Sequence, residues 1–269
     1  MRIGSRDFAT AGHTYIMGIL NVTPDSFSDG GKFNQIDAAL KHAEEMIGDG
    51  ADVIDIGGES TRPGYTKISD EEEIDRVVPV IEAVKKEFEI PISVDTYKSG
   101  VAEAAAEAGA DLINDIWGLK YDARMAEVIA KSGLACCLMH NRDNTEYRNF
   151  MEDMKQNLRE TIALAKAAGI ADDKIILDPG VGFAKSYENN LEVIRRLKEF
   201  NELKYPVLLG TSRKSVIGLT LDLPAAERVE GTIVTTVMAV EAGCMFVRVH
   251  DVKENHRAIQ MAEAILDRK

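Results

Sequence analysis

The sequence has few cysteines and no long hydrophobic run. Its 269 residues include three cysteines, an odd number, and no two of them are spaced as Cys-x-x-Cys. The longest apolar runs, 134–139 and 233–240, are far shorter than the roughly 20 residues that cross a membrane. Polar residues from Ser5 to Asp7 interrupt any apolar stretch after Met1, which argues against a signal peptide. We expect a cytoplasmic protein without a membrane segment.

The cysteines themselves allow two interpretations. Cys136 and Cys137 are adjacent within one apolar run, and Cys244 begins another. This placement favours buried thiols that stay reduced. A vicinal redox pair formed by Cys136 and Cys137 is the alternative.

Basic residues are outnumbered as well. The sequence has 32 Lys and Arg against 45 Asp and Glu, a formal net charge of −13. This balance argues against nucleic acid or an anionic membrane as a partner. A small anionic ligand remains open, because a pocket needs only a few local cations. The hydrophobic content of 45% and the charged content of 29% are ordinary for a globular protein, which excludes disordered, collagen-like and coiled-coil chains.

One pattern recurs along the chain: a glycine after a helical stretch, then a short apolar run that ends in polar residues. It occurs at 50–57 and 109–115, and in looser form at 133–140 and 243–250. The glycine suits the left-handed position that closes a helix, and the run after it is typical of a buried parallel strand. Four further strands are expected at 15–21, 92–95, 175–178 and 207–210, which brings the total to eight.

The segments between these strands have helical periodicity. In the segment 69–88, Ser69 and Glu72 are spaced as a capping box, and Pro79 is expected to kink the helix. The other expected helices are 37–47, 99–108, 124–131, 150–168, 188–200, 225–242 and 254–266.

This alternation predicts an α/β fold: a single (β/α)₈ TIM barrel that forms one domain over residues 1–269. Residues 1–12 are expected to form a short N-terminal hairpin that closes the barrel floor. A flavodoxin-like or Rossmann sheet is the alternative. It is disfavoured because no GxGxxG follows a strand and because eight βα units exceed what such a sheet needs.

Polar residues lie at the ends of the expected strands. The carboxyl ends of the strands form the active site of a TIM barrel, and a buried charge there is costly unless it is paired or used. A whole set converging on one rim therefore favours a functional site over separate structural roles. The set comprises Asn21, Asp55, Gly57, Asp95, Asn114, Asp115, His140, Asp178, Arg213, Lys214, Arg248 and His250.

Three segments after strands carry further candidates. The loops 23–31 and 57–64 are long and polar, and Phe27 and Arg62 would be unusual in inert connections. The segment 210–215 leaves the seventh expected strand and starts a helix. The free N–H groups of that helix and its adjacent basic residues favour an anion there, and residues 248–250 are the alternative place for it.

Several of these segments together resemble the dihydropteroate synthases. Residues 19–30, ILNVTPDSFSDG, resemble the first signature of that family, and residues 50–64, GADVIDIGGESTRPG, resemble the second. The segments 178–183, 212–215 and 248–251 match later family blocks in the same order. The resemblance covers essentially the whole chain.

The resemblance implies a reaction. The family joins 6-hydroxymethyl-7,8-dihydropterin pyrophosphate to 4-aminobenzoate and releases pyrophosphate, in folate synthesis. An ionised carboxylate can accept the two adjacent N–H donors of the pterin edge, and Asp178 is the candidate, with Asn114 beside it. Asp95 would favour cation character as pyrophosphate leaves, and Lys214 would bind the pterin carbonyl or a ring nitrogen. The implied pterin pocket also includes Met139, Phe183 and Gly210.

The resemblance also implies sites for the leaving group and the second substrate. The diphosphate would bind Arg248, His250, Thr61 and Arg62, with Asn21 on a Mg²⁺ ion whose charge compensates the leaving group. The catalytic set implied is Asp95, Lys214, Arg62, Arg248 and His250. No enzyme nucleophile is required, because the amine itself attacks. The aminobenzoate would contact Phe27, Thr61, Arg62, Pro63 and Ser215.

The resemblance further implies a homodimer and leaves two alternative functions. A pterin-binding methyltransferase, which moves a methyl group from methyltetrahydrofolate to a corrinoid protein, would share Asp95, Asn114 and Asp178. It would not need the 23–31 loop or the 212–215 segment. A catalytically silent pterin-binding subunit would be expected to have lost its phosphate-binding residues. Residues 141–143, Asn-Arg-Asp, depart from the pattern of many family members.

Overall fold

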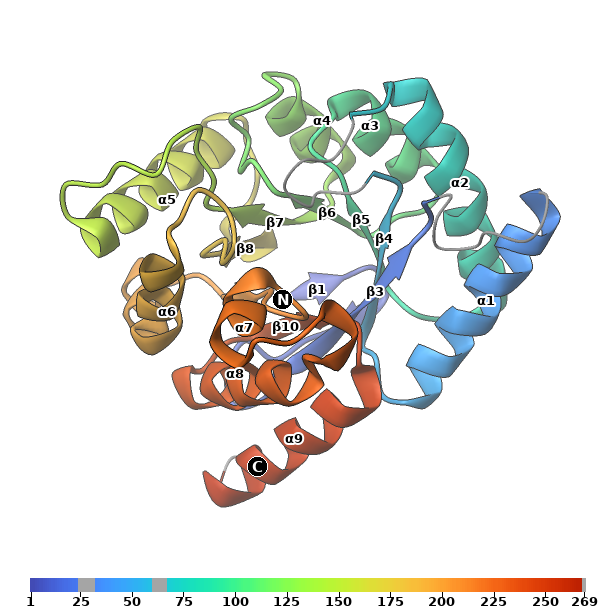
Figure 1. Cartoon of the computed structure of the whole chain (residues 1–269). Coiled ribbons are helices and arrows are strands. Elements are labelled where there is room, and N and C mark those ends of the chain that lie inside the picture. Colours follow the sequence, from blue (N-terminus) through green and yellow to red (C-terminus); the bar gives the residue numbers. More distant parts are fainter. Residues whose placement is uncertain (24–31, 60–66, 268–269) are drawn as a thin grey trace.

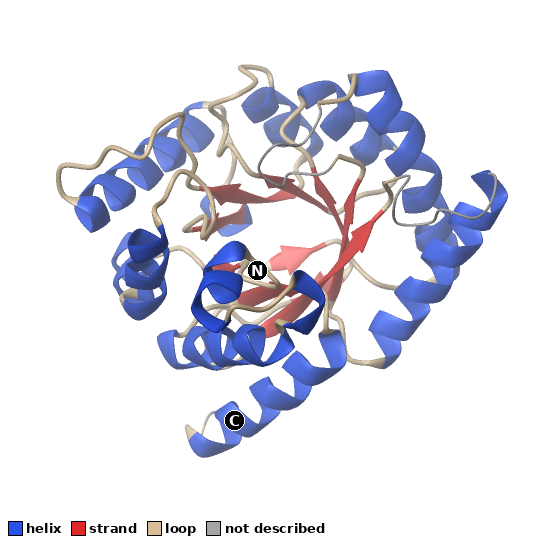
Figure 2. Cartoon of the chain, in the orientation of Figure 1, coloured by secondary structure: helices blue, strands red, loops and turns tan. Residues whose placement is uncertain are grey.

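The computed structural model describes residues 1–23, 32–59 and 67–267. Within these residues, eight parallel strands curve into a barrel with helices on the outside (Figure 1, Figure 2). The strand order is β8-β7-β6-β5-β4-β3-β10-β9, and a bridge between Leu177 and Val207 joins the two ends of the sheet. This confirms the predicted TIM barrel. The strands are β3 (Tyr15–Asn21), β4 (Val53–Gly57), β5 (Ile92–Asp95), β6 (Leu112–Asp115), β7 (Ala135–Met139), β8 (Ile175–Asp178), β9 (Leu208–Leu209) and β10 (Phe246–Val249).

Helices follow the strands as the periodicity predicted. Ser69 is the N-cap of α2, where its side chain accepts from the Glu72 N–H at 3.2 Å, and α2 continues through Pro79. Gly133 and Gly243 close α4 and α8 with φ of 68° and 84°, the left-handed position expected of them. The helices are α1 (Lys32–Gly48), α2 (Asp70–Glu87), α3 (Ser99–Glu107), α4 (Met125–Ser132), α5 (Phe150–Ala167), α6 (Tyr187–Arg195), α7 (Ser215–Leu221), α8 (Val229–Ala242) and α9 (Val252–Ile265).

Two predicted helices are divided in the structure, and a third, predicted at 37–47, begins earlier as α1 at Lys32. The segment 188–200 was expected to be one helix, but α6 ends at Arg195 and a 3₁₀ helix follows over Leu197–Leu203. Leu197, Phe200 and Leu203 are all buried, and a turn of three residues places that spacing on one face. The segment 225–242 likewise divides into a short 3₁₀ turn and α8.

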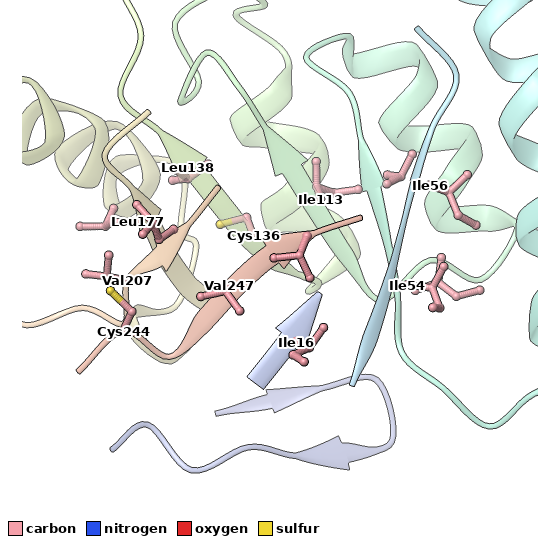
Figure 3. Close-up of a cluster of buried hydrophobic side chains, with 14 of the residues drawn as sticks. Ile16, Ile54, Ile56, Ile113, Cys136, Leu138, Leu177, Val207, Cys244 and Val247 are labelled. Carbon is pink, nitrogen blue, oxygen red and sulfur yellow. The ribbon is translucent and has the colours of Figure 1, made fainter. Parts of the chain in front are cut away.

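Alternate strand residues face opposite sides of the barrel wall. The outward side chains pack against the helices, and Figure 3 shows part of this layer, including Ile113, Cys136, Leu138 and Leu177. Cys137 faces inward instead. All three cysteines are free and buried, and burial raises the pKa of the Cys136 and Cys137 thiols. The predicted burial of the thiols is therefore confirmed, and Cys136 and Cys137 belong to different packing clusters, which disfavours a vicinal redox pair.

The N-terminal hairpin closes one end of the barrel, as predicted. Strands β1 (Arg2–Ile3) and β2 (Arg6–Asp7) pair antiparallel across the floor. Ile3 and Phe8 are buried against the lowest inward side chains of the strands, among them Met17 and Phe246. Apolar packing thus fills the lower end, and the polar inward residues lie at the other end.

Among the described residues, no helix is both long enough and apolar enough to cross a membrane.

Candidate active site

The strand register brings four of the expected polar positions into one row. Asn21 of β3 pairs with Gly57 of β4, Gly57 with Asp95 of β5, and Asp95 with Asn114 of β6. Because all the strands are parallel, these positions lie at the same carboxyl rim. Met139 of β7 pairs with Asp178 of β8 in the same way. The sequence predicted that these residues converge, and the register confirms it.

Arg248 lies on β10, the strand that pairs with β3 at one end of this row. Its Nε donates to Asp55 Oδ2 at 2.5 Å and its Nη2 donates to Asp95 Oδ2 at 2.6 Å. Asn114 Nδ2 donates to the same Asp55 oxygen at 3.3 Å. Asp55 was among the polar strand ends in the sequence but had no assigned role. The structure makes it the residue that orients Arg248.

The Asp95 carboxyl binds its proton more tightly than an exposed aspartate does. Burial raises the pKa of Asp95 to about 7, with Arg248 opposing the rise and Asp55 adding to it. Among the described residues, three buried side-chain oxygens lack a hydrogen-bond partner: Asp55 Oδ1, Ser93 Oγ and Asp95 Oδ1. All three belong to β4 and β5, so unused hydrogen-bonding capacity is concentrated in the interior at these two strands.

A second group of charged residues, Asp178 and Lys214, lies on the opposite side of the rim. Asp178 Oδ1 accepts from the Gly180 N–H at 2.6 Å. Burial raises the pKa of Asp178, and Lys214 opposes that rise. Burial lowers the pKa of Lys214 to about 8, and Asp178 opposes that fall. Gly210 lies between them, because a Cβ there would be 3.5 Å from Asp178 Oδ2 and 3.8 Å from Lys214 Nζ.

Lys214 is held in place by the loop after β8. Its Nζ donates to the Val181 carbonyl at 2.6 Å and lies 4.8 Å from the centre of the Phe183 ring. Lys214 is also the N-cap residue of α7, so Ser215 is the first helical residue, as expected, and is exposed. Phe183 packs against an apolar cluster that includes Met139 and Tyr97. This cluster forms an apolar wall beside the charged groups.

His250 lies next to the charged rim, whereas Arg213 is turned to another partner. The Ser212 Oγ lies 2.9 Å from His250 Nδ1 and accepts from the His250 backbone N–H at 3.1 Å. Arg213 pairs with Asp251 through two hydrogen bonds. Arg213 therefore serves the local structure, and Ser212, which the sequence did not single out, orients His250.

Four of the expected contacts lie outside the described residues: Phe27, Thr61, Arg62 and Pro63. Over the described part of the chain, no group of three or more His, Cys, Asp or Glu side chains is arranged to hold a metal ion.

Known proteins with similar sequences and structures cover the whole of this chain. A family model described as pterin binding enzyme matches residues 17–250. A dihydropteroate synthase of Clostridium beijerinckii is 63% identical over 269 residues and covers 100% of both chains. A dihydropteroate synthase structure from Clostridium difficile, determined in the presence of pteroic acid, has a TM-score of 0.93 and 52% identity and covers 100% of both chains. One from Yersinia pestis, in a sulfonamide drug complex, has a TM-score of 0.93 and 43% identity and covers 99% of both.

Proposed function

Because the chain belongs to the pterin-binding enzymes, and within them to the dihydropteroate synthases, we propose a role for each part of its site in the reaction of that family. The reaction is a transfer: 6-hydroxymethyl-7,8-dihydropterin pyrophosphate and 4-aminobenzoate give 7,8-dihydropteroate and pyrophosphate. The bond between the pterin methylene and the diphosphate oxygen breaks, the amine nitrogen bonds to the methylene, and the amine loses a proton. The observation that carries the proposal is the convergence of Asp95, Asp178, Lys214 and Arg248 on one rim.

The pterin is proposed to bind between Asp178 and the apolar wall. Asp178 Oδ1 accepts from the Gly180 N–H and keeps a second lone pair, so the two carboxylate oxygens can each accept one of the adjacent ring N–H and amino groups. Lys214 would donate to the pterin carbonyl or a ring nitrogen, and Asn114 would complete the polar edge. Met139 and Phe183 supply apolar contact for the ring faces. Gly210 leaves space beside Asp178.

The diphosphate is proposed to bind Arg248 and His250, together with Thr61 and Arg62 from outside the described residues. Mg²⁺ fits beside it at Asn21, because hard cations prefer oxygen ligands and a diphosphate supplies most of them. A Cβ at Gly57 would lie in van der Waals contact with Asn21 Oδ1 and Asp95 Oδ2, at 3.8 Å from each, so the backbone of Gly57 leaves both oxygens uncovered on this side. Bound Mg²⁺ would neutralise negative charge on the leaving group.

Catalysis is proposed to depend on position and electrostatics. Asp95, when ionised, lies where it can favour positive charge on the pterin as the diphosphate departs. Arg248 donates to this carboxylate at 2.6 Å and would also bind the diphosphate. The proposed catalytic set consists of Asp95 and Arg248 together with His250, Lys214 and Arg62. The amine attacks directly, and the site contributes orientation.

The pH profile of kcat/KM is expected to be bell-shaped. Asp95 must lose its proton to act, so kcat/KM should fall as the pH drops below about 7. Lys214 must keep its proton to donate, so kcat/KM should fall as the pH rises above about 8. In Lys214→Arg the charge persists to high pH, and the alkaline limb should disappear. Profiles of both enzymes from pH 5.5 to 9.5 test this, and an alkaline limb that survives in the variant would assign it to another group.

The aminobenzoate is proposed to bind between Phe27, Thr61, Arg62, Pro63 and the start of α7 at Ser215. Sulfonamides resemble aminobenzoate, and a sulfonamide drug is part of the Yersinia pestis complex. We expect pyrophosphate release that requires both substrates, with sulfonamides competing against aminobenzoate. A methyltransferase or a silent pterin-binding subunit would release no pyrophosphate. If sulfonamides compete against the pterin substrate instead, the assignment of the two pockets is wrong.

A homodimer is proposed through the exposed side of α7, α8 and α9, which lie near one another in Figure 1. Leu219, Val234 and Met261 are between 60% and 68% exposed, unusual for large apolar side chains on three neighbouring helices. Light scattering should give twice the chain mass of 29.5 kDa for the wild type and one chain mass for Val234→Lys. The matched control Leu164→Lys, on α5, should stay dimeric. A monomeric wild type would remove the proposal.

The free, buried cysteines support a reducing compartment, and we place the enzyme in the cytoplasm.

A further inference from the structure

Lys185, in the loop after β8, has no role in the site described so far. Its Nζ donates to the carbonyl oxygens of Gly180 and Phe183, both at 2.8 Å, and lies 3.1 Å from His140 Nδ1. An ammonium group has three N–H donors, so these three partners use all of them. The loop 180–185 is thereby closed on itself and fastened to the residue that follows β7.

The same loop supplies contacts of the proposed pterin pocket. Its Gly180 N–H donates to Asp178, and its Val181 carbonyl accepts from Lys214 Nζ. The ring of Phe183, also in this loop, lies beneath the Lys214 ammonium group. The position of Lys214 therefore depends on the shape of this loop. Lys185 in turn binds the carbonyls of Gly180 and Phe183, which lie before and after Val181 in the chain.

The anchor of Lys185 is itself fixed. His140 is 2% exposed, and its Nε2 lies 3.3 Å from Asn157 Oδ1 on α5. Because Nδ1 accepts from Lys185, the ring proton is on Nε2, which donates to Asn157. Burial and, to a smaller extent, the Lys185 charge lower the pKa of His140 to about 2, so the ring stays neutral and remains an acceptor.

Closure of the loop does not depend on the charge of Lys185. Burial lowers its pKa to about 7, Asp178 opposes the fall, and Lys214 and Arg142 add to it. A neutral amine keeps two N–H groups, one for each carbonyl oxygen. The contacts with Gly180 and Phe183 therefore persist in both protonation states.

We propose that Lys185 is a positioning residue of the pterin pocket, which holds the 180–185 loop so that Val181 and Phe183 fix the Lys214 ammonium group. This inference rests on the proposed pterin pocket. It predicts that Lys185 affects binding of the pterin and leaves binding of the diphosphate unchanged, because Arg248 and His250 belong to β10 and the residue after it.

Calorimetric titration of Lys185→Met with 6-hydroxymethylpterin and, separately, with Mg²⁺-pyrophosphate tests the proposal. The pterin Kd should rise at least tenfold, and the pyrophosphate Kd should stay within twofold of the wild type. Lys185→Arg keeps donors for both carbonyls and should restore the pterin Kd to within threefold. Lys174→Met is the matched control, because Lys174 also donates to a backbone carbonyl, that of Arg2 at 3.2 Å, but at the barrel floor. It should change neither Kd.

An unchanged pterin Kd in folded Lys185→Met, or an equal loss of both ligands, would overturn the inference. If circular dichroism shows that Lys185→Met does not fold, Lys185→Gln replaces it, with an expected rise in the pterin Kd of threefold or more. The proposed pocket is tested in the same series. If the wild type does not bind the pterin, both proposals are overturned. If Asp178→Asn loses pterin affinity and Lys185→Met does not, only the proposed role of Lys185 is overturned.

Discussion

Asp178→Asn is expected to weaken pterin binding by ~2–4 kcal/mol, because a charge-assisted pair of hydrogen bonds disappears. This corresponds to a Kd about 30- to 700-fold higher. The amide can keep its oxygen on the Gly180 N–H, where Asp178 Oδ1 now accepts at 2.6 Å. Its NH₂ group would then face the ring donors of the ligand. One ligand N–H would be left buried without an acceptor. Calorimetry with 6-hydroxymethylpterin measures the loss.

The matched control for this experiment is Asp115→Asn. Asp115 is also a buried aspartate at a strand end, next to Asn114, but its two oxygens accept from the Trp117 and Leu119 N–H groups. Its substitution should lower the free energy of unfolding and leave the pterin Kd unchanged. Near-native pterin binding by a folded Asp178→Asn variant would remove Asp178 from the pterin site.

Arg248→Met is expected to lower the free energy of unfolding by ~3–5 kcal/mol near pH 8, because it leaves buried carboxylates without their partner. Arg248 pairs with Asp55 and Asp95, which are 0% and 6% exposed. The variant should also lose activity, since the proposed diphosphate site loses its main cation. Urea unfolding of the variant and the wild type gives the stability difference.

The stability loss should shrink at low pH, and the sign follows from Asp95. Its folded pKa of about 7 is already raised above the ordinary value, and loss of Arg248 removes the main opposing charge and raises it further. Both folded proteins gain stability as Asp95 takes up a proton between pH 8 and 5.5, and the variant gains more because its folded pKa is higher. Arg213→Met, which breaks the half-exposed pair with Asp251, should cost about 1 kcal/mol or less at both pH values. An equal loss at pH 8 and pH 5.5 in Arg248→Met would contradict this account.

The sequence alone was enough for the barrel and for most of the rim. Glycines such as Gly133 and Gly243 mark helix ends, and apolar runs after them mark strands, because both signals depend only on neighbours along the chain. Once the strands are known to be parallel, their carboxyl ends must share one rim. That is why Asp95 and Asp178 could be grouped before any distance was known. The 3₁₀ helix at 197–203 was missed, because burial of its apolar side chains favours a three-residue turn over the α-helical period.

The partners of the rim residues were decided only by the tertiary structure. Asp55 and Arg248 are separated by 193 residues, and they meet because β4 and β10 pair with the two sides of β3. Which strand faces which across the interior depends on the register of the whole sheet, and no local pattern encodes it. Lys185 shows the same limit. In the sequence it is one lysine in a loop, and its contact with His140 exists because β7 and β8 are neighbours whose ends lie side by side. The sequence thus determined which side chains reach the rim, since strand alternation is local. The fold decided which of them are paired, because pairing requires atoms from distant parts of the chain to come within about 3 Å.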